Sequence, residues 1–209
     1  MNSIITRFAP SPTGNLHIGG VRTALINYII TQDAKKKFPN SKFYIRIEDT
    51  DLLRSKKEFK TSILNGLNWL EINYDGTPYL QTENKKRHQE IALDLLNNKK
   101  AFKCICTDAL LEKKRKENIV NKISDKKLCK TCEKDEKIQI LKKDFVVRIK
   151  VPNNGDTSIE DMVQGNVKVK NKEIDDFILL RQDGSPTYML SVVVDDHDMG
   201  VNLIIRGDD

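Results

Sequence analysis

The sequence lacks long hydrophobic stretches: no window approaches the roughly eighteen uncharged apolar residues that a membrane-spanning helix needs. A short strand is predicted within a few residues of Met1, which leaves no room for a secretory signal peptide. Cysteine is scarce, with four residues, and without a secretory signal these favour metal or thiol chemistry over disulfides. The sequence therefore predicts a soluble protein of a reducing, cytoplasmic compartment, with no membrane partner.

Acidic residues are too few to balance the basic ones, and the excess positive charge is concentrated. The chain of 209 residues has a net charge of +6. Between Lys99 and Lys143, fifteen Lys and Arg stand against seven Asp and Glu, so this segment carries +8 and the remainder −2. A concentrated basic segment predicts a polyanionic partner, although lysines on solvated helices would give the same composition. The 38% hydrophobic content suffices for one sizeable core, or one domain interrupted by a second.

The first residues predict a strand, a turn and a helix. Residues 4–9 form a short apolar run, and the prolines and glycine of residues 10–14 exclude a regular strand or helix through the turn. A helix is predicted to begin directly after Gly19 and Gly20. Its core-facing side is predicted to consist of Val21, Ala24, Leu25, Tyr28, Ile29 and Gln32.

This turn has the properties of a phosphate site. Unpaired backbone N–H groups and the helix dipole at a helix N-terminus attract an anion. Gly19 and Gly20 allow a nucleotide to approach the backbone closely, and His17 is placed to donate to phosphate oxygens as charge develops at phosphorus. An ordinary strand-to-helix turn with a surface histidine would show the same residues.

A second strand is predicted over residues 43–47, and it ends in an acidic segment that contains Glu48, Asp49 and Asp51. Ligands of open parallel sheets collect at the carboxyl ends of strands, so these carboxylates could face a cationic substrate group or a metal. A solvated acidic turn is the alternative. Ser55 and Glu58 then form a predicted capping box that opens the next helix.

The cysteines form two pairs in the basic segment. Cys104-x-Cys106 and Cys129-x-x-Cys132 are separated by twenty-two residues, a spacing that fits a tetrahedral zinc site with four thiolates. Four protein sulfurs leave no open position for water, so such a site is structural. Four unlinked thiols are the alternative.

The later part of the chain predicts a small antiparallel sheet and then a return to the first domain. Strands are expected around residues 145–151 and 164–170. The apolar run from Val192 to Val194 predicts a buried central strand, and the chain reaches residue 206 in another apparent strand. The predicted domains are residues 1–98, a basic insertion over 99–186, and residues 187–209.

Five segments carry a resemblance to a known family: RFAPSPTGNLHIGG, RIEDTD, DGSPTY, VVVDDHDMG and LIIRGDD. In this order and spacing they resemble bacterial-type glutamyl-tRNA synthetase, a class I aminoacyl-tRNA synthetase. Gly20 replaces the last histidine of the HIGH motif, a form that the bacterial glutamyl enzymes use. The resemblance implies an α/β, Rossmann-like nucleotide-binding fold with a parallel sheet, interrupted by an α+β zinc-containing insertion that binds the acceptor end of tRNA.

The resemblance also implies residue roles. Catalysis falls to His17 with Gly19 and Gly20. ATP binding falls to Pro10, Thr13, His17, Gly19, Gly20 and Asp209. Glutamate binding falls to Arg7, Ala9, Ser11, Glu48, Tyr188 and Arg206, and the guanidinium groups suit the bidentate recognition of carboxylates. Zinc binding falls to Cys104, Cys106, Cys129 and Cys132.

The implied activity is that of a glutamate-tRNA ligase. Glutamate attacks the α-phosphorus of Mg·ATP, and tRNA(Glu) then takes up the glutamyl group. A monomer is expected. In the family a KMSKS-like loop and anticodon-reading domains come after this part, so these residues are expected to be a fragment that is inactive alone. The alternatives are glutamyl-Q tRNA(Asp) synthetase, a non-tRNA nucleotidyltransferase of the same fold, and a zinc-containing RNA-binding module without catalysis.

Overall fold

A computed structural model describes residues 2–51, 53–121 and 127–207, and the chain forms two compact units. The first combines Met1–Lys86 with Ser191–Asp209, and the second is Arg87–Leu190. The chain therefore leaves the first unit, forms the second and returns, as expected for a domain interrupted by an insertion. The predicted functional boundaries at residues 98/99 and 186/187 stay a prediction. Within the described ranges, no helix is both long and apolar enough to cross a membrane.

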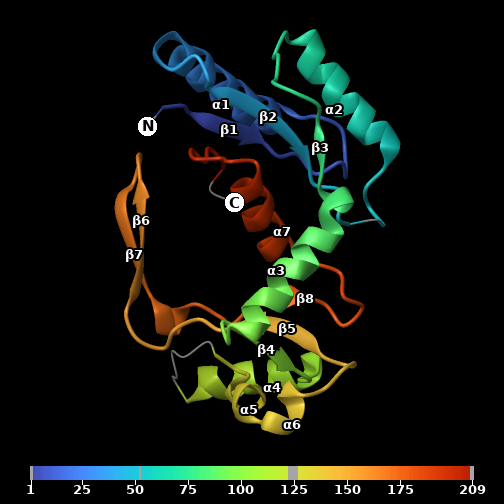
Figure 1. The fold of residues 1–209 in the computed structure, drawn as a ribbon, viewed down its shortest axis with the longest axis vertical. Helices are drawn as coiled ribbons and strands as arrows, with labels where there is room; N and C mark the ends of the chain where they lie inside the picture. The colour runs from blue at the N-terminus through green and yellow to red at the C-terminus, as the bar shows by residue number, and fades with distance from the viewer. Residues whose placement is uncertain (1, 52, 122–126, 208–209) are drawn as a thin grey trace. The chain divides into compact units, whose positions relative to one another are not determined.

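The first unit is built on a parallel sheet with strand order β1-β2-β3 (Figure 1). Its elements are β1 (Ile5–Phe8), α1 (Ile18–Lys37), β2 (Lys42–Ile47), α2 (Lys57–Trp69), β3 (Tyr79–Leu80) and the 3-10 helix η1 (Gln81–Asn84). In register, Ile5 lies opposite Lys42 and Phe8 opposite Ile45. Parallel neighbours bring the carboxyl ends of β1 and β2 to one edge, which is where ligands of such sheets bind.

The second unit contains antiparallel sheets in the orders β4-β5-β8 and β6-β7. Helix α3 (Lys85–Asn97) leads into it and α7 (Tyr188–Asp198) leads out of it. Between them lie β4 (Ala101–Cys104), α4 (Asp108–Val120), α5 (Lys130–Lys134), α6 (Glu136–Gln139), β5 (Val146–Ile149), β6 (Asp156–Asp161), β7 (Gly165–Lys170), η2 (Asn171–Glu173) and β8 (Ile178–Leu180). The α/β class and the α+β character of the insertion are thereby confirmed.

Four local predictions are wrong. Val192–Val194 lie in helix α7, and residues 201–207 form no regular element. The capping box does not form, because α2 begins at Lys57 and Ser55 therefore stands outside the N-cap position; its buried hydroxyl has no hydrogen-bond partner among the described residues. The glycine pair belongs to the first turn of α1, which begins at Ile18 rather than after Gly20.

The buried side of α1 also differs from the predicted one. Ala24, Asn27 and Thr31 are fully buried, whereas Leu25 and Ile29 are exposed. Thr31 shares a hydrogen bond of 2.7 Å with Thr6 of β1 and donates to the carbonyl oxygen of Asn27 at 2.9 Å. Because the Thr31 hydroxyl is paired at the strand-helix contact, a polar residue can occupy a position that hydrophobicity alone assigns elsewhere.

The core of the first unit leaves little room around Leu16. A Cβ at Gly66 of α2 would stand 2.9 Å from Leu16 Cδ2, and one at Gly20 of α1 would stand 3.1 Å from Leu16 Cδ1. Leu16 therefore lies against a glycine of each helix, and a methyl group at either glycine would have to displace its side chain.

We expect Gly66→Ala to lower the free energy of unfolding by about 0.5–2 kcal/mol. Alanine gains roughly 0.5–1 kcal/mol in helix preference, but overpacking against Leu16 costs about 1–3 kcal/mol. Urea denaturation measures the change. Asn65→Ala, at the exposed neighbouring position, is the control and should be neutral or slightly stabilising. A Gly66→Ala protein more stable than wild type would show that Leu16 moves aside freely.

Candidate active site and metal centre

The loop between β1 and α1 presents a helix N-terminus. His17 occupies the N-cap position in an extended conformation (φ −114°, ψ 168°), and its side chain makes no capping hydrogen bond to the described chain. The N–H groups of Ile18, Gly19 and Gly20 therefore face outward, which is the arrangement that holds phosphate. The exposed His17 ring packs over Gly19, where a Cβ would lie 3.1 Å from ring atoms Nδ1 and Cε1.

Backbone hydrogen bonds join this loop to the segment after β2. The N–H of Glu48 donates to the carbonyl oxygen of Pro10 at 3.0 Å, and that of Lys56 donates to Pro12 at 3.1 Å. Ala9, Ser11 and Thr13 lie in the same loop, so most residues predicted for ATP and glutamate in the first unit gather at one sheet edge.

At this edge four charged side chains form a buried network. Arg7 grips Asp196 with two hydrogen bonds, from Nε at 3.0 Å and from Nη2 at 3.1 Å. Arg46, 0% exposed, donates from Nη1 to the same Asp196 and from Nη2 to Glu48 Oε1 at 3.2 Å. Two cations and two anions thus alternate, with Arg46 at the centre.

Burial dominates the electrostatics of this network. It raises the pKa of Glu48, and the neighbouring Arg46 only partly offsets the effect. For Arg46, burial by itself would lower the pKa, but Asp196 and Glu48 together raise it. Arg46 therefore keeps its charge, whereas Glu48 is protonated more readily than an exposed glutamate.

Asp195, the neighbour of Asp196 in α7, binds η1 rather than the arginines. Asp195, fully buried, accepts hydrogen bonds from Gln81 Nε2 at 2.9 Å and Asn84 Nδ2 at 3.3 Å. Asp49, after β2, accepts from the backbone N–H and the hydroxyl of Thr82, both at 2.9 Å. Carboxylates from two distant segments therefore fix η1 next to the network.

Sequence reasoning missed Arg46, Asp195 and Asp196. A signal was present, because an arginine between two isoleucines of a strand, and an acidic pair directly after three valines, are charged groups in apolar surroundings. Of the other predicted site residues, Arg206 is exposed and donates from Nε to the Gly207 carbonyl oxygen at 3.3 Å. Tyr188 belongs to the second unit, and Asp209 lies outside the described residues.

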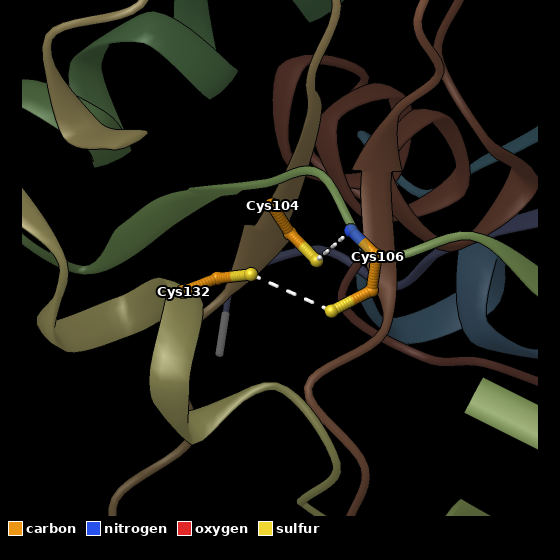
Figure 2. A group of neighbouring side chains, drawn as sticks. All are labelled: Cys104, Cys106 and Cys132. Carbon is orange, nitrogen blue, oxygen red and sulfur yellow. Dashed lines mark hydrogen bonds between the residues drawn. The ribbon is translucent and has the colours of Figure 1, made fainter. Parts of the chain in front are cut away.

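The second unit brings three of the four cysteines together (Figure 2). The Sγ atoms of Cys104, at the end of β4, Cys106, in the following loop, and Cys132, on α5, all lie within 4.8 Å of one another. Cys106 Sγ is 3.4 Å from Cys132 Sγ, and the Cys106 N–H donates to Cys104 Sγ at 3.4 Å. Cys129 is buried directly before α5, and it lies close enough to Cys104 for each thiol to shift the pKa of the other.

The pKa values of three of these thiols are shifted by their neighbours and by burial. The hydrogen bond from Cys129, with a smaller contribution from Arg148, lowers the pKa of Cys104 to about 5. The same hydrogen bond, together with burial, raises the pKa of Cys129, and burial raises that of Cys132 to about 12. Three sulfurs converge within 4.8 Å and a fourth cysteine lies beside them, so the donor set fits a soft metal such as zinc.

Gln139 of α6 supports the cluster from outside. Its side chain accepts from the Lys103 N–H at 2.9 Å and donates to the carbonyl oxygens of Lys103 at 3.0 Å and Cys132 at 2.6 Å. One amide thus joins β4, which ends at Cys104, to α5, which carries Cys132. This contact holds the two cysteine-bearing segments in place independently of a metal.

A parallel α/β sheet, a glycine-bearing helix start and charged groups gathered at the strand ends define a nucleotide-binding domain. The comparison with known families is more specific. The chain belongs to the class I tRNA synthetases: the family described as tRNA synthetases class I (E and Q), catalytic domain, matches residues 3–209.

Individual relatives agree with this family. The chain is 48% identical over 208 residues to glutamate-tRNA ligase 1 of Ehrlichia canis, covering 100% of this chain and 43% of that protein. It is 48% identical over 207 residues to glutamate-tRNA ligase 2 of Zymomonas mobilis, covering 99% and 42%. A crystal structure of a glutamate tRNA ligase from Elizabethkingia meningosepticum in complex with its amino acid is similar, with a TM-score of 0.82, 29% identity and coverage of 98% and 44%. The chain thus spans less than half the length of these relatives.

Proposed function

We propose that this chain supplies the amino-acid-activating part of a glutamate-tRNA ligase. In that reaction the γ-carboxylate of glutamate remains free while an oxygen of the α-carboxylate attacks the α-phosphorus of ATP. Glutamyl-adenylate and pyrophosphate form, and the terminal adenosine of tRNA(Glu) then accepts the glutamyl group. The observation that carries the proposal is the juxtaposition of Arg7 and Glu48, opposite charges suited to an amino acid, with the helix start at His17.

ATP binding would use the loop after β1 and the first turn of α1. The outward N–H groups of Gly19 and Gly20 are donors for phosphate oxygens, and the exposed His17 ring can donate to the charge that develops at phosphorus. Pro10 and Thr13 shape the loop, and Asp209 is proposed near the nucleotide. Mg²⁺ enters with ATP and neutralises its phosphates. Catalysis then consists of positioning and electrostatic stabilisation.

Glutamate binding would use charges of both signs. Arg7 and Arg206 are proposed to hold carboxylates and Glu48 the amino group, because guanidinium forks bind carboxylates in two-point fashion and a carboxylate binds an ammonium. The remaining contacts are proposed for Ala9, Ser11 and Tyr188. Burial of Arg7 at 6% exposed and of Glu48 at 8% strengthens both interactions.

The second unit would hold a structural zinc ion and contact RNA. Cys104, Cys106, Cys129 and Cys132 are the proposed ligands; the ion would fix the short helices of a segment with little apolar core. The excess of Lys and Arg in this segment suits the phosphate backbone of the tRNA acceptor end. Cytoplasmic localisation and a monomeric state are part of the same proposal.

Glutamate-dependent ATP–pyrophosphate exchange tests the activity. It is measured in the presence of tRNA(Glu), on this chain and on this chain joined to the C-terminal half of the Ehrlichia canis relative. Exchange that requires glutamate and disappears in His17→Ala supports the proposal. Binding of a sulfamoyl analogue of glutamyl-adenylate, measured by calorimetry, reports on the pocket without turnover. A chain that binds neither glutamate nor this analogue contradicts the proposal, whereas RNA binding alone would favour the non-catalytic alternative.

The affinity for glutamate should fall in mildly acidic solution. The pKa of Glu48 is raised above 4.5, so Glu48 becomes neutral at a higher pH than an exposed glutamate and loses its attraction for the substrate ammonium. The effect of pH on the stability of the fold has the opposite sign. Burial favours neutral Glu48, so the contribution of this residue to the free energy of unfolding is lost as pH rises through its pKa in the folded protein. Calorimetry at several pH values measures the binding effect, and Glu48→Gln, which cannot titrate, should show weak binding that is independent of pH over this range.

A further inference from the structure

Arg46 and Asp196 are buried members of the charged network, and the proposed function gives neither of them a role. Arg46 is 0% exposed and Asp196 8% exposed. Enclosing charges is costly unless each one is paired. Here the charges balance, because the two positive charges of Arg7 and Arg46 are paired with the two negative charges of Glu48 and Asp196.

The contacts connect the two oppositely charged groups of the proposed glutamate site through these residues. Arg46 Nη2 is 3.2 Å from Glu48 Oε1, and its Nη1 contacts Asp196 Oδ1. Asp196 in turn holds Arg7 through Oδ1 at 3.0 Å and Oδ2 at 3.1 Å. Arg46 and Glu48 stand two positions apart around the end of β2, so both can point to the same side of the sheet.

The donors of Arg7 are divided between two uses. A guanidinium carries five N–H groups, and Asp196 takes those of Nε and one from Nη2. Asp196 therefore binds the Nε–Nη2 edge of the guanidinium. The N–H groups of the other edge, on Nη1 and Nη2, keep the geometry to bind a second carboxylate. Asp196 thus fixes the plane of Arg7 without using its substrate-facing end.

We propose that Arg46 and Asp196 are positioning residues of the glutamate site. Asp196 holds the guanidinium plane of Arg7, and Arg46 holds Glu48 in place and ionised. The carboxylate and the ammonium group of one glutamate are thereby recognised together. This inference rests on the proposed binding of glutamate by Arg7 and Glu48. Neither Arg46 nor Asp196 itself touches the substrate.

Asp196→Asn is the first test. The amide keeps the size of the side chain, but its NH2 group faces a donor of Arg7, so the two-point grip and the charge are lost together. In the full chain, calorimetry should show L-glutamate binding roughly 30-fold weaker, whereas ATP binding changes less than about twofold. Asp75→Asn is the matched control: Asp75 also accepts from Lys35 and from the backbone of β2, but outside this network, and its loss should change neither affinity.

Two further measurements separate positioning from a purely structural effect. In the Arg7→Lys background, Asp196→Asn should weaken glutamate binding little further, because it acts through Arg7. In Arg46→Gln, the pH below which glutamate binding is lost should move upward, because Glu48 then loses its nearest cation. The charged groups that face Glu48 are Arg46 of β2, Arg7 of β1 and Asp196 of α7.

The outcomes distinguish this inference from the proposed function. If wild type binds no glutamate, both are wrong. If wild type binds glutamate and folded Asp196→Asn binds it equally well, the positioning role alone is wrong. Equal losses of glutamate and ATP affinity, or additive losses with Arg7→Lys, would also overturn it, since these are signs of a general loss of structure. Arg46→Lys, which keeps the charge, should restore part of the affinity lost in Arg46→Gln.

Discussion

Replacing Cys132 by serine should reduce bound zinc from about one equivalent per chain to a small fraction of that value. Serine offers a hydroxyl that stays protonated where zinc requires a thiolate, and three sulfurs hold the ion far more weakly than four. Metal content after purification with added zinc, measured by elemental analysis, gives the result. Thr131→Ser, an exposed neighbour in the same helix, is the control and should retain the metal.

The loss of metal should also destabilise the second unit. Its cluster of buried residues consists largely of the cysteines themselves with Phe102, Leu111 and Ile138, so few apolar contacts remain once the sulfurs repel or reprotonate. Structural zinc contributes on the order of 10 kcal/mol in small domains. Calorimetric melting should therefore show an early transition in Cys132→Ser and in chelator-treated wild type. An unchanged melt with a stoichiometric metal content would contradict the four-thiolate assignment.

Arg46→Met should lower the free energy of unfolding by about 3–5 kcal/mol. Methionine fills a similar volume, but Glu48 and Asp196 are left as buried carboxylates without their common partner. Urea denaturation at neutral pH measures the loss. Lys35→Met, which removes a partly exposed ion pair with Asp75, should cost at most about 1 kcal/mol.

The pH dependence of the Arg46→Met effect identifies its cause. Without the guanidinium, Glu48 keeps a pKa raised by burial and loses the cation that lowers it, so it takes up a proton as pH falls and the penalty shrinks. The difference in stability from wild type should therefore be largest at neutral pH and smaller in acid. A difference that is independent of pH would point to lost packing rather than to uncompensated charge.

The sequence predicted the structure correctly where local sequence patterns and tertiary packing favour the same element. Residues 43–47 were predicted to be a strand, and β2 covers them, although Arg46 on the polar side of the alternation is buried as well. The two cysteine pairs were predicted to meet, and the structure brings Cys104, Cys106 and Cys132 together, with Cys129 near Cys104. Both predictions depend on short spacings that the fold preserves.

The sequence did not predict the structure where tertiary contacts determine the conformation of a segment. Val192–Val194 form a short apolar run that has no helical or strand period of its own, and its place in α7 depends on the contacts of the neighbouring aspartates. Helix geometry sets adjacent residues about 100° apart, so Asp195 reaches Gln81 while Asp196 reaches Arg7. A strand would have placed these aspartates on opposite faces of a sheet. Predicting the charged network requires the helical assignment of α7. The places of Arg46 and Asp196 in the network could therefore not be predicted from the sequence.

The division of the first unit between two chain segments also has a consequence for folding during synthesis. Arg46 is made 150 residues before Asp196, and the second unit lies between them. At roughly 5–20 residues per second, a nascent chain holds Arg46 without this partner for about 8–30 s. The second unit can complete its own contacts during that interval, and the sheet of the first unit reaches its final charge balance only when α7 emerges. We therefore expect the inserted unit to become protease-resistant on the ribosome before the unit into which it is inserted.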